Sequence, residues 1–123
     1  MQFSRIEKVS IVKLALQIAA ADGKFVGEEK NMLILKAASL DVEPEEFVPI
    51  LRESESLKSE TALAMVTNMT PAQKRFVAAY LGTIVAVDGN VDDAETKLWS
   101  LISALCGLPA MDISEAIEIM ANK

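Results

Sequence analysis

The sequence predicts an all-α fold, and three observations support this prediction. Apolar residues make up 51% of the chain but aromatic residues only 5%, a balance typical of helices that pack through aliphatic side chains. Apolar residues recur three or four positions apart, as in Ile6, Val9, Val12 and Leu16, which places them on one helical face. No segment between turn signals alternates apolar and polar residues, so no strand is expected. The length of 123 residues suits a single domain over residues 1–123.

Start and stop signals divide the chain into seven predicted helices. Gly23 and Gly89 each end an apolar helix, because glycine readily adopts the backbone conformation that follows a helix C-terminus. Thr70 and Gln73 form a capping-box pattern around Pro71, which is the clearest helix start in the chain. The predicted helices run approximately over Ser4–Ala21, Gly27–Leu40, Pro44–Glu53, Leu57–Asn68, Pro71–Val87, Asp92–Cys106 and Met111–Ala121.

The two halves of the chain share one pattern. When Asp22-Gly23 is aligned with Asp88-Gly89, the flanking apolar and polar positions agree, so a helix–turn–helix unit occurs twice, over about 5–53 and 71–122. We expect the two units to pack as a pseudo-twofold pair. Their most apolar helices would then cross at the centre, where Gly82 or the neighbouring alanines would permit a close approach.

Both units contain the motif Asp-Gly-x-apolar-x-x-x-Glu, which matches the second half of an EF-hand calcium loop. The residues are Asp22, Gly23, Phe25 and Glu29 in the first copy, and Asp88, Gly89, Val91 and Glu95 in the second. The first half of an EF-hand loop is missing, because its ligand positions would fall on Ile18 and Ala20, and on Ile84 and Ala86. These side chains donate no oxygen, so neither copy is an ordinary EF-hand loop.

Two interpretations of these turns stay open. In the structural one, Gly23 and Gly89 supply the turn, Phe25 and Val91 pack between helices, and the glutamates cap the following helix. In the functional one, the carboxylates form a weak site for a divalent cation, calcium or magnesium, or for a basic group of a partner. The candidate ligands are Asp88, Asp92, Glu95, Asp22 and Glu29, and the second copy has the denser set of oxygens.

Charge and composition exclude several classes of function. The net charge of −6 argues against nucleic acids and anionic membranes as partners, because both require clustered positive charge. The absence of histidine removes the commonest general base and transition-metal ligand. The single cysteine, Cys106, excludes an internal disulfide and fits the reducing cytoplasm. Neither strongly apolar segment, Ile11–Ala21 or Phe76–Val87, is long enough to cross a membrane. No catalytic motif is present, so we expect the protein not to be an enzyme.

The segments Ala20-Ala21-Asp22-Gly23-x-Phe25-x-x-x-Glu29 and Ala86-Val87-Asp88-Gly89-x-Val91-x-x-x-Glu95 resemble the tellurite-resistance TerB-like family. That family includes the N-terminal domain of the DjlA co-chaperones, and the resemblance extends from about Ile6 to Ile119. It implies a seven-helix bacterial domain, associated with tellurite and stress responses, whose acidic Asp-Gly segments bind divalent metal or partners. Asp22, Glu29, Asp88 and Glu95 occupy the corresponding positions. The first copy departs from the family pattern, since Val26-Gly27 stands where the second copy has Asp92.

These observations predict a stress-associated binding or adaptor module with a protein partner. A small metal-dependent hydrolase that uses carboxylates, and a homodimeric scaffold without a ligand, are the alternatives. Three further side chains have a structural interpretation: Cys106 is expected on an apolar helix face, and Tyr80 and Trp99 are expected in the core rather than in a ligand pocket.

Overall fold

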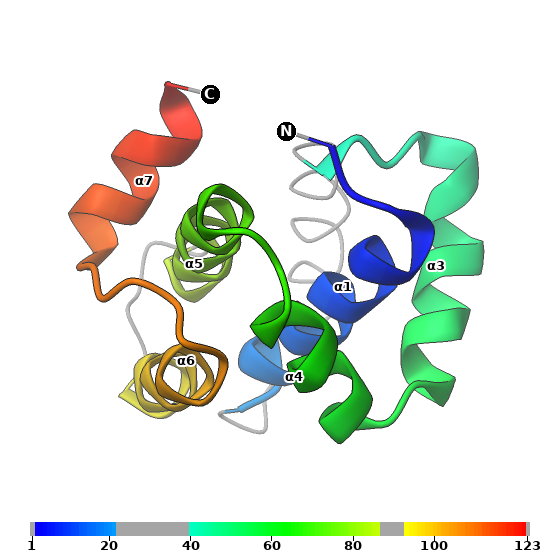
Figure 1. The fold of residues 1–123 in the computed structure, drawn as a ribbon, viewed down its shortest axis with the longest axis horizontal. Coiled ribbons are helices and arrows are strands. Elements are labelled where there is room, and N and C mark those ends of the chain that lie inside the picture. Colours follow the sequence, from blue (N-terminus) through cyan, green and yellow to red (C-terminus); the bar gives the residue numbers. More distant parts are fainter. Residues whose placement is uncertain (1, 22–39, 87–92, 123) are drawn as a thin grey trace.

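A computed structural model describes residues 2–21, 40–86 and 93–122, and these residues form helices and loops without a strand. The fold is therefore all-α, as predicted (Figure 1). In the described part, none of the helices combines the length and the apolar character that crossing a membrane requires. The helices are α1 (Arg5–Ala19), α3 (Pro44–Ser56), α4 (Ser59–Thr67), α5 (Pro71–Val85), α6 (Asp93–Cys106) and α7 (Ile113–Ala121).

The described residues thus contain six helices, whereas the sequence predicted seven over the whole chain. The predicted helix from Gly27 to about Leu40 lies outside the described residues, apart from Leu40 itself, which is buried. The duplication of a helix–turn–helix unit and its pseudo-twofold packing are therefore not established by the described part of the chain.

Two capping boxes fix the starts of the two central helices. Before α5, the Gln73 amide donates to Thr70 Oγ1 at 3.1 Å and the Thr70 amide donates to Gln73 Oε1 at 3.1 Å, as the sequence predicted. Before α1, Ser4 and Glu7 form the same reciprocal pair. Each box satisfies amide groups that a helix N-terminus otherwise leaves without a partner.

The end of α3 corrects one prediction. The helix was predicted to end near Glu53, before the polar residues Ser54, Glu55 and Ser56. In the structure it continues to Ser56. Ser54 is fully buried, and its hydroxyl donates to the Leu51 carbonyl at 2.6 Å, which satisfies the side chain inside the helix. A buried serine with its own hydrogen bond does not interrupt a helix, so composition alone misplaced this boundary.

Helix α6 ends at Cys106 as predicted, whereas the start of α7 differs slightly from the prediction. Gly107 ends α6 with φ of +68°, and the Leu108 amide donates back to the Ser103 carbonyl at 2.9 Å, which is the Schellman arrangement. Helix α7 begins at Ile113 instead of Met111, because the Asp112 side chain caps it by accepting a hydrogen bond from the Glu115 amide at 2.8 Å.

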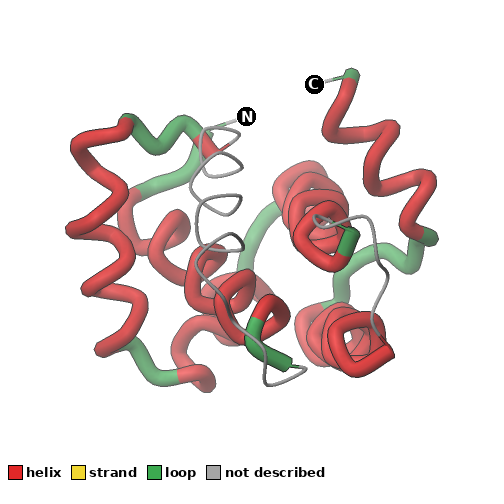
Figure 2. Tube along the Cα trace, turned by 180° about the vertical axis from the view of Figure 1, so that it is seen from behind, coloured by secondary structure: helices red, strands yellow, loops and turns green. Residues whose placement is uncertain are grey.

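The centre of the molecule is formed by α1 and α5, which pack against one another as predicted (Figures 1 and 2). Helices α3 and α4 pack on α1, and α6 and α7 pack on α5. Every residue of α5 from Phe76 to Val85 is buried. The two apolar helices therefore carry the core, because they are the elements with contacts on most of their sides.

Gly82 permits a close approach of α6 and α7 to α5. A Cβ atom added at Gly82 would lie 2.7 Å from Ala116 Cβ of α7 and 2.7 Å from Trp99 Cζ2 of α6. The prediction was that Gly82 or the neighbouring alanines would let the first apolar helix approach this one. The absent side chain of Gly82 allows α6 and α7 to meet on one face of α5.

Candidate functional site

Most residues of the predicted acidic site lie outside the described part of the chain. This applies to Asp22, Gly23, Phe25 and Glu29 of the first Asp-Gly copy, and to Asp88, Gly89, Val91 and Asp92 of the second. Glu95 is described. Among the described residues, no group of three or more Asp, Glu, Cys or His side chains is arranged to hold a metal ion.

Glu95 lies in the first turn of α6 and is only 6% exposed. It shares the inner face of this helix with Trp99, Ile102 and Cys106, which follow at helical spacing and are all buried. Glutamate is seldom buried to this extent unless its charge is paired. The second Asp-Gly motif therefore ends in a carboxylate that the fold shields from solvent.

Trp99 fixes the position of the helix that carries Glu95. Its indole Nε1 donates to the Ala78 carbonyl of α5 at 3.1 Å, and its ring lies against Gly82. Glu95 precedes Trp99 by about one helical turn, so the anchored indole limits the movement of the turn that carries Glu95.

The three side chains assigned to structure are buried, as expected. Burial raises the pKa of the Cys106 thiol, and its Sγ lies 3.5 Å from the Leu63 carbonyl, so the thiol behaves as a core group. Trp99 and Tyr80 also belong to the core. Burial raises the pKa of Tyr80, whose hydroxyl has no hydrogen-bond partner among the described residues.

A surface groove that the sequence did not predict lies between the first turns of α1 and the last turns of α3. We call it the α1–α3 groove, and its volume is about 770 Å³. Its walls include Arg5, Ile6, Val9, Arg52, Glu53 and Leu57. Ile6 is 41% exposed although it is a large apolar side chain, whereas Val9 is buried.

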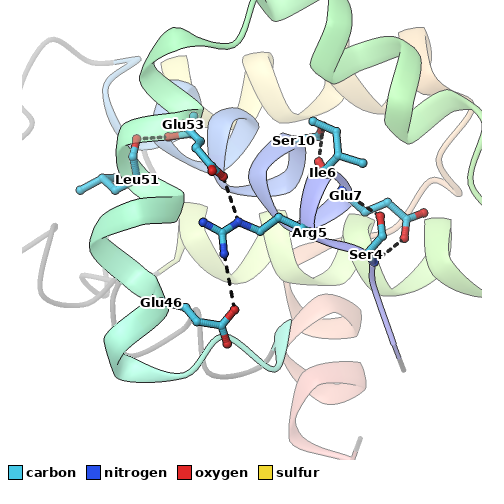
Figure 3. A network of polar contacts seen from close by, with 9 residues as sticks. Ser4, Arg5, Ile6, Glu7, Ser10, Glu46, Leu51 and Glu53 are labelled. Carbon is cyan, nitrogen blue, oxygen red and sulfur yellow. Dashed lines mark hydrogen bonds and ion pairs between the residues drawn. The ribbon is translucent and has the colours of Figure 1, made fainter.

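An ion-pair network ties the two walls of this groove together (Figure 3). Arg5 Nε donates to Glu53 Oε2 at 2.9 Å, and Arg5 Nη1 lies 3.8 Å from Glu46 Oε2. The hydrogen bond to Glu53 is the main reason why the pKa of Arg5 is raised. Arg5 comes from α1 and both glutamates come from α3, so the network links the two helices at the surface.

A second hollow, the α5–α7 cleft, has a volume of about 590 Å³. It brings together three acidic residues from two distant segments, Asp41 before α3 and Glu115 and Glu118 on α7, beside Arg75 of α5. Asp41 has φ of +58° and its carbonyl accepts a hydrogen bond from Lys8 Nζ at 3.0 Å. No sequence motif links these positions, because only the tertiary fold makes them neighbours.

Comparison with protein-family models gives no match, and comparison with curated proteins gives none either. The resemblance to the TerB-like family therefore stays a prediction. Among solved structures, the chain is similar to the protein of unknown function PG1108 from Porphyromonas gingivalis W83. The two share 38% sequence identity with a TM-score of 0.90, and the match covers 99% of this chain and 92% of the other. Identity at this level over nearly the whole of both chains shows common descent, and the protein belongs to the same family as PG1108.

Proposed function

We propose that this protein is a non-enzymatic binding module of the cytoplasm, related in architecture to the TerB-like domains and associated with stress responses. It would recognise a divalent cation, or a basic face of a partner protein, through its acidic Asp-Gly turns. The segment from Asp88 to Glu95 is the principal site. The proposal includes the seven-helix fold with two repeated units, of which the second provides the better ligand set.

The observation that carries the proposal is the burial of Glu95 at the start of α6. Glu95 closes the second acidic motif, and its helix is held in place by the hydrogen bond from Trp99 to Ala78. The attraction between a carboxylate and a cation is stronger where both are shielded from water, because the effective dielectric constant is lower, and binding is favourable where this gain exceeds the cost of desolvating both charges. The net charge of −6 further raises the local concentration of cations and basic groups.

Metal titration of the isotope-labelled protein, followed by NMR, tests the cation version. We expect calcium, magnesium or manganese to shift the amides of residues 88–95 with saturation at roughly millimolar concentration, since a site with few oxygen ligands binds weakly. Glu95→Gln and Asp88→Asn should remove the saturable shifts. Glu45→Gln is the matched control, because Glu45 is an exposed first-turn glutamate of α3 outside the motif.

Three outcomes separate the versions of the proposal. If the NMR signals of the amides of residues 88–95 do not shift at about 10 mM metal, the cation version is wrong. A lysine-rich peptide is then titrated, and shifts in the same amides that disappear in Glu95→Gln would support the version with a basic partner. If neither probe moves them, the turns are structural and the proposal fails.

One observation favours the homodimeric scaffold as a second candidate. Leu101 and Leu105 lie one turn apart on the outer face of α6 and are 54% and 56% exposed. Exposed leucines at this spacing are typical of helices that pair with another helix. Sedimentation analysis tests this candidate: a dimer that Leu101→Glu converts to a monomer would support it, and a monomer at high concentration would refute it.

A further inference from the structure

We infer that the α1–α3 groove binds a helical segment of a partner protein that carries a large apolar side chain next to an acidic one. The inference does not depend on the Asp-Gly turns. It rests on the apolar floor of the groove, on its fixed walls and on the charge of its rim.

The floor of the groove is apolar and partly uncovered. Ile6 leaves 41% of its surface exposed there, next to the buried Val9 and the half-buried Leu57. Apolar surface exposed in a groove between two helices is a common docking site for the apolar side of a third helix. The groove is a surface depression and not an enclosed cavity, so it cannot surround a small ligand in the way that most cofactor sites do.

The walls of the groove are set before any partner arrives. The capping box of Ser4 and Glu7 fixes the first turn of α1, and Arg5 links this turn to Glu53 on α3. A groove whose walls are already in place loses little conformational entropy when it is filled. The Arg5–Glu53 contact, which itself lines the groove, therefore favours binding by holding the two walls together.

The rim of the groove determines the charge of the partner. Arg5 is shared by Glu53 and Glu46, but Glu46 does not line the groove, so at the rim itself the closer pair of Arg5 and Glu53 is close to neutral. Arg52 is exposed and also lines the groove, and within the described part of the chain it has no ion pair. The rim thus offers one uncompensated cation beside apolar surface, which suits a carboxylate adjoining an apolar side chain. The net charge of −6 opposes an acidic partner only weakly at this point, because physiological salt screens charges beyond about 8 Å.

Two synthetic peptides test the inference on the full chain. Both are alanine-based helices with leucines one turn apart; one carries glutamates beside the leucines, and its twin carries lysines there. We expect the glutamate peptide to shift the amides around Ile6, Arg52 and Leu57 in NMR spectra, and to bind about threefold to fivefold more tightly than the lysine peptide.

Substitutions identify the groups responsible. Arg52→Glu should reverse the preference between the peptides, whereas Arg75→Glu, the same change at an exposed arginine on α5, should leave the preference intact. Ile6→Ser should weaken the binding of both peptides about fivefold, because it removes the exposed apolar side chain from the floor of the groove. Thermal unfolding of each variant checks that the fold is retained.

The inference is overturned if neither peptide moves these amides, or if both bind equally well to the native protein. It is also overturned if Arg52→Glu leaves the preference unchanged. If decanoate shifts the groove amides and the glutamate peptide does not, the groove takes a small aliphatic acid. If diluting the protein without any peptide shifts the groove amides, the occupant is a second copy of the chain. Loss of the metal response in Glu95→Gln with unchanged peptide binding would separate this groove from the proposed acidic site.

Discussion

Replacing Gly82 by alanine tests the packing of three helices at one point. The new Cβ would lie 2.7 Å from Ala116 Cβ, 2.7 Å from Trp99 Cζ2 and 3.0 Å from Trp99 Cη2. Carbon atoms in good contact are roughly 3.5–4.0 Å apart, so the methyl group overlaps both neighbours by about an ångström. The Trp99 ring cannot rotate away without losing the hydrogen bond that its Nε1 donates to the Ala78 carbonyl at 3.1 Å.

The expected loss of stability follows from two opposing effects. Overpacking of a core costs about 1–3 kcal/mol. Alanine is better than glycine inside a helix by about 0.5–1 kcal/mol, which offsets part of this cost. Gly82→Ala should therefore lower the free energy of unfolding by about 1–2 kcal/mol, and lower Tm by roughly 3–10 °C for a chain of this size.

Urea denaturation, followed by circular dichroism and by the fluorescence of the single tryptophan, measures this change. The double variant Gly82→Ala/Ala116→Gly provides the control, because it removes one of the two overlapping neighbours. The cost of Ala116→Gly should be smaller in the Gly82→Ala background, with a coupling energy of about 0.5 kcal/mol or more. A Gly82→Ala protein as stable as the native one would show that α6 and α7 do not pack on α5 as described.

Two further predictions concern local groups. Thr70→Ala should destabilise the protein by about 1 kcal/mol in urea denaturation, because it removes the cap of α5, whereas Thr67→Ala at an exposed position of α4 should have a smaller effect. Cys106 should make stability depend on pH. Its pKa is raised in the folded protein, so the folded state keeps the proton longer than the unfolded chain. The contribution is fully present below the ordinary thiol pKa of about 8.5 and is lost as pH rises through the folded pKa. Urea midpoints from pH 7 to 10 should fall more steeply for the native protein than for Cys106→Ala; parallel curves would contradict this.

Local signals in the sequence predicted local features of the fold. Thr70, Pro71 and Gln73 are close in sequence, so their capping box needs no tertiary information, and it forms as predicted. Gly107, which directly follows the predicted end of α6 at Cys106, is another local signal, because glycine readily adopts the positive φ that ends a helix. The boundary near Ser54 was wrong because the burial of that serine depends on the neighbours that α3 acquires in the folded chain.

The candidate sites also divide into features that local sequence could predict and features that depend on tertiary contacts. The burial of Glu95 could have been inferred from its spacing to Trp99, Ile102 and Cys106, which places it on the core face of α6. The contact between Arg5 and Glu53 joins positions that are 48 residues apart, and neither belongs to a motif. The α1–α3 groove could therefore be found only in the folded structure.

Helix α7 is held to the rest of the described protein mainly through a single neighbouring helix. Among the described helices it packs chiefly against α5, and Ala116 is its one fully buried residue. A helix at the end of the chain that packs mainly against one neighbour opens at a lower free energy than the centre of the molecule. In hydrogen exchange, the amides of α7 should lose protection well before those of α5. Each such opening would uncover the part of α5 that faces Ala116, while Trp99 stays against Gly82 and α1 and α5 stay folded, so the native state would include a minor population with a separated C-terminal helix.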